Sequence, residues 1–364
     1  MRAGLWGTEV RLSSYVNIDF AEVYRLAEEQ SVIGLVAAGI DHVSDIRPPK
    51  EDVLQFIGQS LQLEQQNQAM NQFIGVMVER LRKAGIYTLL VKGQGIAQCY
   101  EKPLWRACGD VDLFLSDDNY EKAKDFLAPL ASSVEKEYVR EKHLGMTIDP
   151  WVVELHGRLY CGLSSKVEKE LDRVFQDTFY GGNVRSWNND YVQVFLLSPE
   201  NDAFYVFTHI LQHFYKGGIG IRQVCDWCRL LWTYREKLDL RLLEERIQRA
   251  GLMSEWRAFG AFAVEYLGMP VESMPMLDTS FNFPDPRFKM KANRICSFIM
   301  EVGNFGHNRD RSYFGKYPYF IRKAISFGHR IGDLYRHARI FPLDSFRFLP
   351  AIAINGVRSA IRGE

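Results

Sequence analysis

The sequence predicts an α+β fold in which a central α/β unit lies between N-terminal helices and a larger C-terminal helical part. Apolar residues recur at three- and four-residue spacing as far as Lys83, which is typical of amphipathic helices. Short apolar runs bounded by glycine begin at Tyr87, and helical spacing returns after about Ser164. With 364 residues, 47% of them hydrophobic, the chain is long enough for two or three units.

Residues 1–85 form the expected N-terminal helical segment. Its apolar spacing predicts helices over Asp19–Val43 and Lys50–Lys83, and the second helix follows Pro48 and Pro49. Residues 86–162 form the expected α/β core. Its predicted elements are a strand Tyr87–Val91, a helix Gln94–Tyr100, a strand Asp110–Leu115, a helix Asp118–Leu130, and extended segments Glu135–Arg140, Gly145–Ile148 and Trp151–Leu155.

The remaining sequence predicts a helical domain over residues 163–268 and a basic, aromatic helical region over residues 269–364. The helical windows of the domain are Pro199–Tyr215, Ile219–Tyr234, Leu240–Ala250 and Met253–Leu267. A proline-containing connector, Gly268–Pro286, follows them. The last fifty residues hold nine Lys or Arg against three acidic residues, so this region carries a local positive charge.

Charge and cysteine content exclude several classes of protein. Lys plus Arg (45) equal Asp plus Glu (45), which argues against a chain that coats nucleic acid along its length. Six cysteines without a disulfide-like spacing favour a reducing compartment. The longest apolar run, Val32–Ile40, is far below the roughly 20 residues of a membrane span, and the first residues do not resemble a signal peptide. We therefore expect a cytoplasmic protein.

Three acidic residues form the most informative pattern in the chain. Asp110 and Asp112 stand two residues apart in a predicted strand, so both side chains point to one face. Such a pair repels itself unless a cation neutralises it, and Mg²⁺ prefers oxygen ligands of this kind. Glu154 alternates with Val153 and Leu155 and would join the same face if the two strands are neighbours. The alternative interpretation is a solvent-facing strand whose acids merely alternate with apolar residues.

Residues around this pattern suit a phosphate ligand. Gly93 and Gly95 lie where a strand meets a helix, so backbone N–H groups there can hold phosphate without interference from side chains. Lys92 and Arg106 add positive charge nearby. His156 is two residues from Glu154 and therefore shares its face of the strand.

These residues resemble the uncharacterised nucleotidyltransferase-like proteins of the DNA polymerase beta superfamily, which are common in bacterial surface-polysaccharide gene clusters. The resemblance covers roughly residues 20–265. The matching motifs are Lys92-Gly93 at the end of a strand, Arg106 before Gly109-Asp110-Val111-Asp112-Leu113, Glu154-Leu155-His156, and a His-x-x-x-His with a following Arg-x-x-x-Asp at His209, His213, Arg222 and Asp226.

The resemblance implies a mixed-sheet nucleotidyltransferase core that moves a nucleoside monophosphate from a nucleoside triphosphate to a hydroxyl-bearing acceptor. Asp110, Asp112 and Glu154 would bind two Mg²⁺ ions, with Mn²⁺ as the alternative metal. The acceptor is a sugar, a small metabolite or a protein, and there is no strong signal for nucleic acid. The residues expected to bind nucleotide and phosphate are Lys92, Gly93, Gln94, Arg106, Gly109, His156, His209, His213 and Arg222.

Three alternatives stay open at this point. Gln94 follows Gly93 where the wider superfamily has serine, which favours a catalytically inactive member that binds a nucleotide or a partner. His209, His213, Cys225 and Cys228 could instead hold zinc. Arg222 and Asp226 are also spaced as an ordinary helical ion pair.

The basic segment Lys316–Arg362 has two interpretations. Its apolar stripe either packs on the helical domain, which we favour, or lies on an anionic membrane surface.

Overall fold

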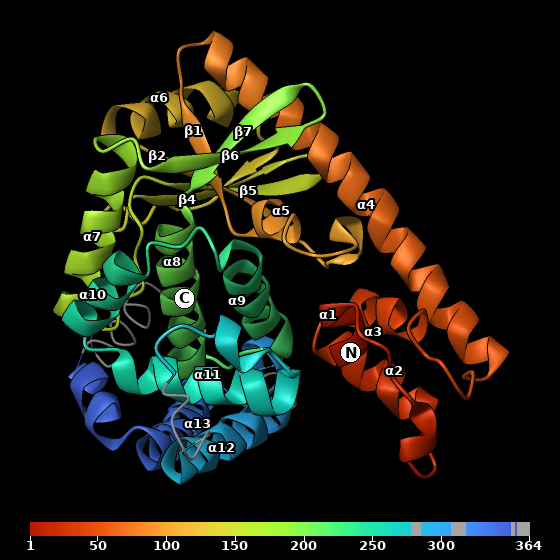
Figure 1. The fold of residues 1–364 in the computed structure, drawn as a ribbon. Coiled ribbons are helices and arrows are strands. Elements are labelled where there is room, and N and C mark those ends of the chain that lie inside the picture. Colours follow the sequence, from red (N-terminus) through yellow and green to blue (C-terminus); the bar gives the residue numbers. More distant parts are fainter. Residues whose placement is uncertain (278–284, 307–317, 351–353, 355–364) are drawn as a thin grey trace.

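The computed structural model describes residues 1–277, 285–306, 318–350 and 354, and combines one seven-stranded sheet with helices on both of its faces (Figure 1). Along the chain, the N-terminal helices precede the α/β core and the C-terminal helices follow it. The predicted α+β class with a mixed sheet is therefore confirmed.

The sheet is mixed because its strands run in both directions. Its strands are β1 (Thr88–Val91), β2 (Asp110–Leu115), β3 (Ser133–Val134), β4 (His143–Ile148), β5 (Trp151–His156), β6 (Val184–Asn189) and β7 (Val192–Leu197). They lie in the order β3-β4-β5-β2-β1-β7-β6. The pairs β2/β5 and β1/β7 are parallel, and the other neighbours are antiparallel. Strands β2 and β5 are adjacent although about forty residues separate them in the chain, and this pairing places the acidic residues.

The hairpin β6–β7 extends the sheet beyond the segment in which the sequence predicted strands. It lies between residues 163 and 268, where the sequence indicated only helices. Strand β6 is an edge strand with mostly accessible side chains, so it lacks the apolar pattern on which strand prediction depends. Strand β7 pairs with β1 in parallel, so the sheet draws on residues well past 162.

The N-terminal part contains four helices: α1 (Arg2–Trp6), α2 (Phe20–Glu29), α3 (Ile33–Ile40) and α4 (Lys50–Lys83). The single helix predicted over Asp19–Val43 is wrong, because the chain breaks at Ser31, whose φ of 56° lies in the left-handed region. The α4 prediction is confirmed. This helix of 34 residues is about 51 Å long at 1.5 Å per residue. The buried residues of its C-terminal half, from Met70 to Leu81, pack against the sheet, whereas Phe56 in its N-terminal half contacts Tyr24 of α2.

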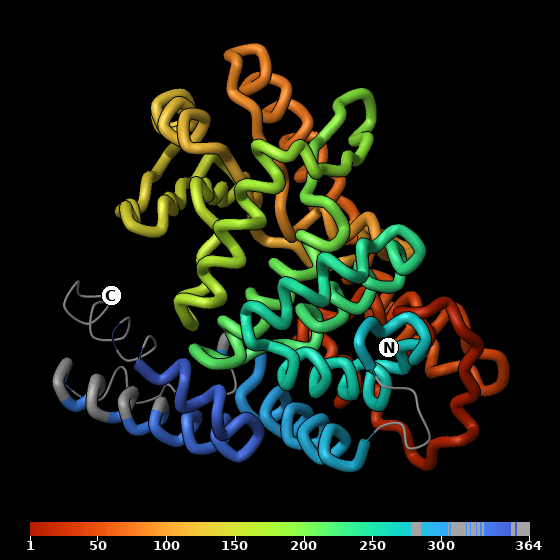
Figure 2. The backbone as a smooth tube through the Cα atoms, turned by 60° about the vertical axis from the view of Figure 1, so that its left-hand side comes forward, coloured from red at the N-terminus to blue at the C-terminus, as the bar shows by residue number. Residues whose placement is uncertain are grey.

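The remaining helices of the core and of the helical domain complete the fold. They are α5 (Gly93–Ala97), α6 (Asp117–Leu127), α7 (Ser165–Phe179), α8 (Pro199–Lys216), α9 (Ile221–Tyr234), α10 (Leu240–Ala250), α11 (Met253–Leu267), α12 (Pro286–Val302) and α13 (Tyr319–Ile340). Figure 2 follows the chain from its first helix, which lies beside the end of α11, where Trp6 Nε1 donates to the carbonyl of Leu267 at 2.6 Å. The first helix is thus joined directly to the end of α11.

Two apolar cores lie on the two faces of the sheet. One core packs alternate strand residues, among them Leu113 and Leu155, against α4 and α6. The other core contains Phe114 and the helices of the helical domain, including α8 and α9. Strand alternation therefore turns Asp110, Asp112 and Glu154 toward the helical domain, and Figure 1 shows α8 and α9 beneath that face.

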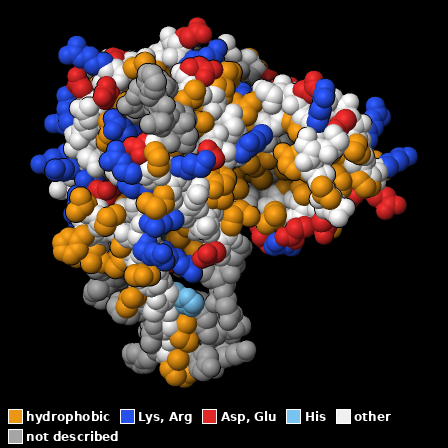
Figure 3. All heavy atoms as spheres, turned by 60° about the horizontal axis from the view of Figure 1, so that its bottom comes forward, with side chains coloured by type: hydrophobic (Ala, Val, Ile, Leu, Met, Phe, Trp, Pro, Cys, Tyr) orange, Lys and Arg blue, Asp and Glu red, His pale blue; other side chains and the backbone are white. Residues whose placement is uncertain are grey.

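The C-terminal segment packs partly on the helical domain. His337, Ile340, Phe341 and Phe348 are buried, and the rings of Phe214 and His337 lie 4.6 Å apart. Ile331 and Tyr335 of α13 are 53% and 65% exposed, and hydrophobic and basic side chains are interspersed on the face shown in Figure 3. Of the predicted segment Lys316–Arg362, residues 316–317, 351–353 and 355–362 lie outside the described residues. Across the described ranges, no helix is both long and apolar enough to span a bilayer.

Candidate active site

Three carboxylates meet at the centre of the sheet, on the face toward the helical domain. Asp112 on β2 is the direct partner of Glu154 on β5, and Asp110 precedes Asp112 by two residues on the same face. One ligand oxygen from each of the three lies within 4.8 Å of the other two. The structure therefore brings together the acids that strand alternation placed on one face, and the alternative of a solvent-facing strand is wrong, since Asp112 is only 2% exposed.

The carboxylates perturb one another electrostatically. The charge of Asp112, followed by desolvation, raises the pKa of Asp110, while Lys92 acts in the opposite direction. Asp110 is the most accessible of the three side chains. Like charges at this spacing leave a surplus of negative charge, which a divalent cation with oxygen ligands would neutralise. The donor set therefore fits Mg²⁺ or Mn²⁺.

Lys92 is the nearest cation to the carboxylates. Its Nζ lies 2.6 Å from Asp112 Oδ1. Burial acts to lower the pKa of the ammonium, but Asp112, together with smaller contributions from Tyr205, Asp110 and Glu154, raises it overall. Its backbone has φ 57° and ψ −145°, a conformation that costs a non-glycine residue of order 1–3 kcal/mol. Gly93 follows with φ 42°, and a Cβ there would approach Cys108 Sγ at 3.3 Å. Strain at the end of β1 therefore directs the lysine at the acids.

Two histidines complete the acidic cluster. His156 Nε2 lies 2.8 Å from Asp112 Oδ1 and 3.5 Å from Glu154 Oε2. These contacts raise the pKa of His156 against the opposing effect of burial. His143 Nε2 lies 3.2 Å from the same Oε2. Burial acts to raise the pKa of Glu154, but the two imidazoles and Lys92 lower it, so Glu154 is held ionised.

Sequence reasoning missed His143. The predicted strand began at Gly145, whereas β4 begins at His143, directly opposite His156. The signal was present, because His143 precedes the buried Leu144 and is two residues from Gly145, so a strand through it places the imidazole on the site face. The structure thus adds one titratable group to the predicted set.

Helix α8 covers the cluster with a second pair of imidazoles. The Nε2 atoms of His209 and His213 lie 3.1 Å apart. Burial, and then the charge of Lys92, lower the pKa of both residues, that of His213 to about 4. Tyr205, one turn earlier, is also buried, and its pKa is raised by burial with a further contribution from Asp112. These two predicted histidines are therefore neutral groups within electrostatic reach of Lys92.

Arg106 and Arg222 are engaged with Asp226 of α9. Arg106 forms a two-pronged contact with Asp226, at 3.0 Å from Nε to Oδ1 and 2.7 Å from Nη2 to Oδ2. Tyr100 Oη also donates to Asp226 Oδ1 at 2.7 Å. Arg222 Nη1 lies 3.7 Å from Asp226, so the helical ion pair predicted as an alternative is present. The charge of Arg222 also acts to lower the pKa of Asp110, so this guanidinium lies within electrostatic reach of the carboxylates. The guanidinium of Arg106 instead forms its hydrogen bonds with Asp226.

The glycine-rich turn is used mainly for packing. Gln94 is buried and donates from Nε2 to Asn67 Oδ1 of α4 at 2.7 Å, so its side chain points into the core. A Cβ on Gly95 would meet Leu196 Cδ2 at 2.8 Å, which explains glycine there by the close approach of α5 to β7. Gly109, just before Asp110, is exposed and has open space around it.

The zinc site suggested by His209, His213, Cys225 and Cys228 is not assembled. Both cysteines are fully buried in the apolar core, and burial raises the pKa of each thiol. Within the described ranges, two groups of three or more potential metal ligands occur, and neither contains a cysteine. They are Asp110–Asp112–Glu154 and His143–Glu154–His156.

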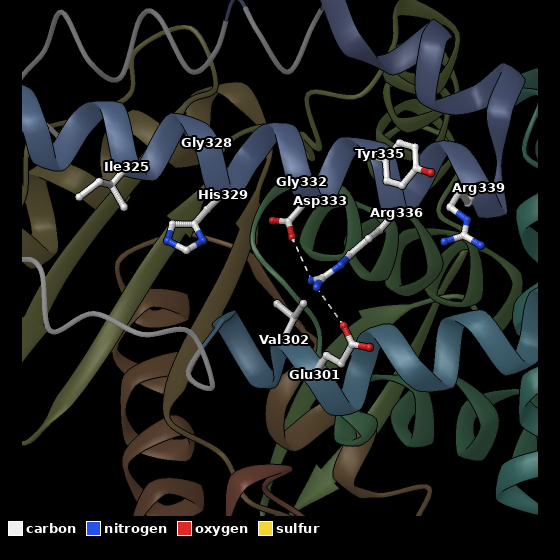
Figure 4. Close-up of a pocket in the computed structure, with 10 residues that line it drawn as sticks. All are labelled: Glu301, Val302, Ile325, Gly328, His329, Gly332, Asp333, Tyr335, Arg336 and Arg339. Carbon is white, nitrogen blue, oxygen red and sulfur yellow. Dashed lines mark ion pairs between the residues drawn. The ribbon is translucent and has the colours of Figure 1, made fainter.

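A separate cavity of about 630 Å³ lies between α12 and α13 (Figure 4). Arg336 of α13 reaches Glu301 of α12 at 3.0 Å and also lies 3.9 Å from Asp333 on its own helix. None of the predicted site residues lines this cavity.

Comparison with known families matches residues 17–268 to a family described as "Uncharacterised nucleotidyltransferase". The chain belongs to this family. The matched range contains the three carboxylates, Lys92 and the four histidines described above, and it ends where the Gly268–Pro286 connector begins. Searches of curated proteins and of solved structures gave no significant match. Membership identifies a transferase of nucleotidyl groups whose substrate is a nucleotide, and it does not specify the acceptor.

Proposed function

We propose that this nucleotidyltransferase moves a nucleoside monophosphate from a nucleoside triphosphate to a hydroxyl-bearing acceptor at Asp110, Asp112 and Glu154. The observation that carries the proposal is the gathering of three carboxylates, with ligand oxygens within 4.8 Å of one another, on two adjacent parallel strands. A cytoplasmic location suits such an enzyme, because its nucleotide substrate is made there.

The carboxylates have distinct proposed roles. When bound by Asp110, Asp112 and Glu154, two Mg²⁺ ions would activate the attacking oxygen and neutralise the triphosphate. Asp110, the most accessible of the three side chains, and Asp112 are proposed to hold the ions. Glu154, which its imidazole partners and Lys92 hold ionised, is proposed to complete the ligand set or to accept the proton of the attacking hydroxyl.

The proposed reaction forms a bond between the acceptor oxygen and the α-phosphorus and breaks the bond to the β-phosphate, releasing pyrophosphate. Lys92, His156 and Arg222 supply positive charge around the carboxylates and are the proposed contacts of the triphosphate. Gly93 and the open Gly109 flank the site and are proposed to admit phosphate. His209 and His213 would line the opposite side from α8 as neutral groups. Gln94 and Arg106 contribute indirectly, because both side chains have other partners.

One observation favours a second candidate, a catalytically inactive member that binds a nucleotide or a partner. Gln94 stands where the wider superfamily has serine, and its side chain points at Asn67 instead of toward the carboxylates. In that case nucleotide binding would persist while transfer is absent.

Thermal shift and label transfer together test the proposal. The melting temperature of the full chain is measured with each nucleoside triphosphate, with and without Mg²⁺, for the wild type, Asp110→Asn and the exposed control Asp118→Asn. Label from α-³²P and from γ-³²P nucleotides is then followed into sugars, metabolites and proteins of a cell extract. We expect Mg²⁺-dependent stabilisation and transfer of the α label only, both lost in Asp110→Asn and retained in Asp118→Asn. Transfer of the γ label, or unchanged activity of Asp110→Asn, would contradict the assignment, and binding without any transfer would favour the inactive member.

A further inference from the structure

We propose that His143, Glu154 and His156 form a second metal site, distinct from the carboxylate triad, that takes a nitrogen-preferring divalent transition ion such as Zn²⁺. The proposal rests on the geometry of β4 and β5 and goes beyond nucleotidyl transfer. The two sites share only Glu154.

The register of the β4–β5 hairpin builds this site. His143 lies directly opposite His156, and Gly145 lies opposite Glu154. The intervening residues Leu144 and Leu155 are buried in the core on the other face, so both imidazoles and the carboxylate project from the same face. Gly145 presents no side chain to Glu154, and a Cβ there would meet Glu135 Oε2 at 2.6 Å.

The distances match the coordination of zinc. Ligands placed about 2.1 Å from a tetrahedral ion lie about 3.4 Å from one another. His143 Nε2 and His156 Nε2 lie 3.2 and 3.5 Å from Glu154 Oε2, and one potential ligand atom of each residue lies within 4.8 Å of the others. Three protein ligands leave a fourth position open. The side chains of His143 and Glu154 are 25% and 28% exposed, so an ion can enter from solvent.

The donor atoms separate this site from the triad. Two imidazole nitrogens and one carboxylate oxygen favour zinc, nickel, iron or copper, whereas an all-oxygen set favours magnesium or manganese. Both imidazole contacts use Glu154 Oε2, so Oε1 is the oxygen that an ion at the triad would take.

His156 links the two sites. Its Nε2 lies 2.8 Å from Asp112 Oδ1, and the same nitrogen cannot both hold that hydrogen bond and bind an ion. Filling the imidazole site therefore releases Asp112 from His156.

Metal binding to the untagged, full-length chain tests the proposal. The protein is freed of metal with a chelator and titrated with Zn²⁺, and bound zinc is counted by elemental analysis. Co²⁺ is used in parallel because its visible spectrum reports the number and type of ligands. We expect the wild type to bind one equivalent of zinc tightly, and His143→Gln and His156→Gln each to bind it at least about 100-fold more weakly. Loss of a group that only hydrogen-bonds to a metal ligand already weakens metal binding about 10–100-fold, so loss of a ligand itself should cost at least as much.

Three further variants serve as controls. His42→Gln removes a partly exposed histidine 3.7 Å from Glu101 and should bind zinc as the wild type does. His209→Gln should also retain the tight equivalent. Asp110→Asn should retain it while losing Mg²⁺-dependent nucleotide binding, which separates failure of this site from failure of the proposed function. Absence of zinc binding in the wild type, tight binding that survives both His143→Gln and His156→Gln, or loss of binding in His209→Gln would overturn the proposal.

Discussion

The buried contact between Arg106 and Asp226 ties the loop that leads into β2, the strand of Asp110 and Asp112, to the helical domain, and its loss should be costly. The side chains are 5% and 6% exposed, and two hydrogen bonds join them. Asp226→Asn leaves the guanidinium buried without its counter-charge and weakens the acceptor of Tyr100. Breaking a buried pair by removing one partner costs about 3–5 kcal/mol. We expect Asp226→Asn to lower the free energy of unfolding by about 3 kcal/mol, since asparagine still accepts one of the bonds.

Urea denaturation of the full chain measures this effect as a shift of the midpoint at unchanged slope. Glu79→Gln, at an exposed helical ion pair with Lys83, is the matched control and should leave the midpoint unchanged. Replacing both partners, as in Arg106→Met with Asp226→Leu, should recover part of the loss, because two apolar groups need no counter-charge, although Tyr100 Oη still loses its acceptor. A loss below about 1 kcal/mol in Asp226→Asn would refute the reasoning. If the double variant is stable but no longer stabilised by nucleotide, Arg106 contacts the ligand directly.

Three more predictions concern charge and packing. Asp110→Asn and Asp112→Asn should each abolish Mg²⁺-dependent transfer of the α label while circular dichroism shows an intact fold, and wild-type turnover in either variant would exclude the triad. Without metal, the melting temperature of Asp110→Asn should be unchanged or higher than that of the wild type, because repulsion between the carboxylates, which raises the pKa of Asp110, is removed. Burial raises the pKa of Glu255 from 4.5 to about 8, so the free energy of unfolding should fall as pH rises between these values, by at most about 5 kcal/mol. Glu255→Gln should show a smaller fall, and parallel profiles of unfolding free energy against pH for the two proteins would contradict this. Deleting residues 316–364 should give insoluble protein, because Phe341 and Phe348 are removed from the core that they share with Phe214. The intact chain should show no salt-sensitive sedimentation with anionic liposomes. A soluble, active truncated protein together with liposome binding by the intact chain would assign the segment to the membrane.

Period-two alternation was enough to place the three carboxylates on one face, because Asp112 and Glu154 each stand between buried apolar neighbours and Asp110 lies two residues before Asp112. Asp112 and Glu154 meet through a parallel pairing across about forty residues, which periodicity alone does not specify. The helices α4, α8, α10 and α11 were predicted closely because each has a long apolar face, whereas the edge strand β6 has none.

The contact partner of a side chain was harder to predict than the face of the strand or helix on which it lies. The sequence placed Gln94 and Arg106 near phosphate because they adjoin the motif, but Asn67 and Asp226, remote in sequence, hold both side chains. Cross-strand neighbours such as His143 and His156 depend on register, and the register follows from the turn at 149–150, which has no apolar signal. Proximity along the chain therefore identifies candidate residues without identifying their partners.

The contact between Lys92 and Asp112 gives a buried carboxylate a counter-charge within the protein itself. A carboxylate that is 2% exposed is normally stable only beside a positive charge, and in this chain the ammonium of the residue directly after β1 provides it at 2.6 Å. Any ion that binds at the proposed triad would therefore compete with this internal cation. Metal affinity at the proposed site would then depend on how readily the side chain of Lys92 moves aside. A nucleotide that draws the ammonium toward its phosphates would make room for the ion.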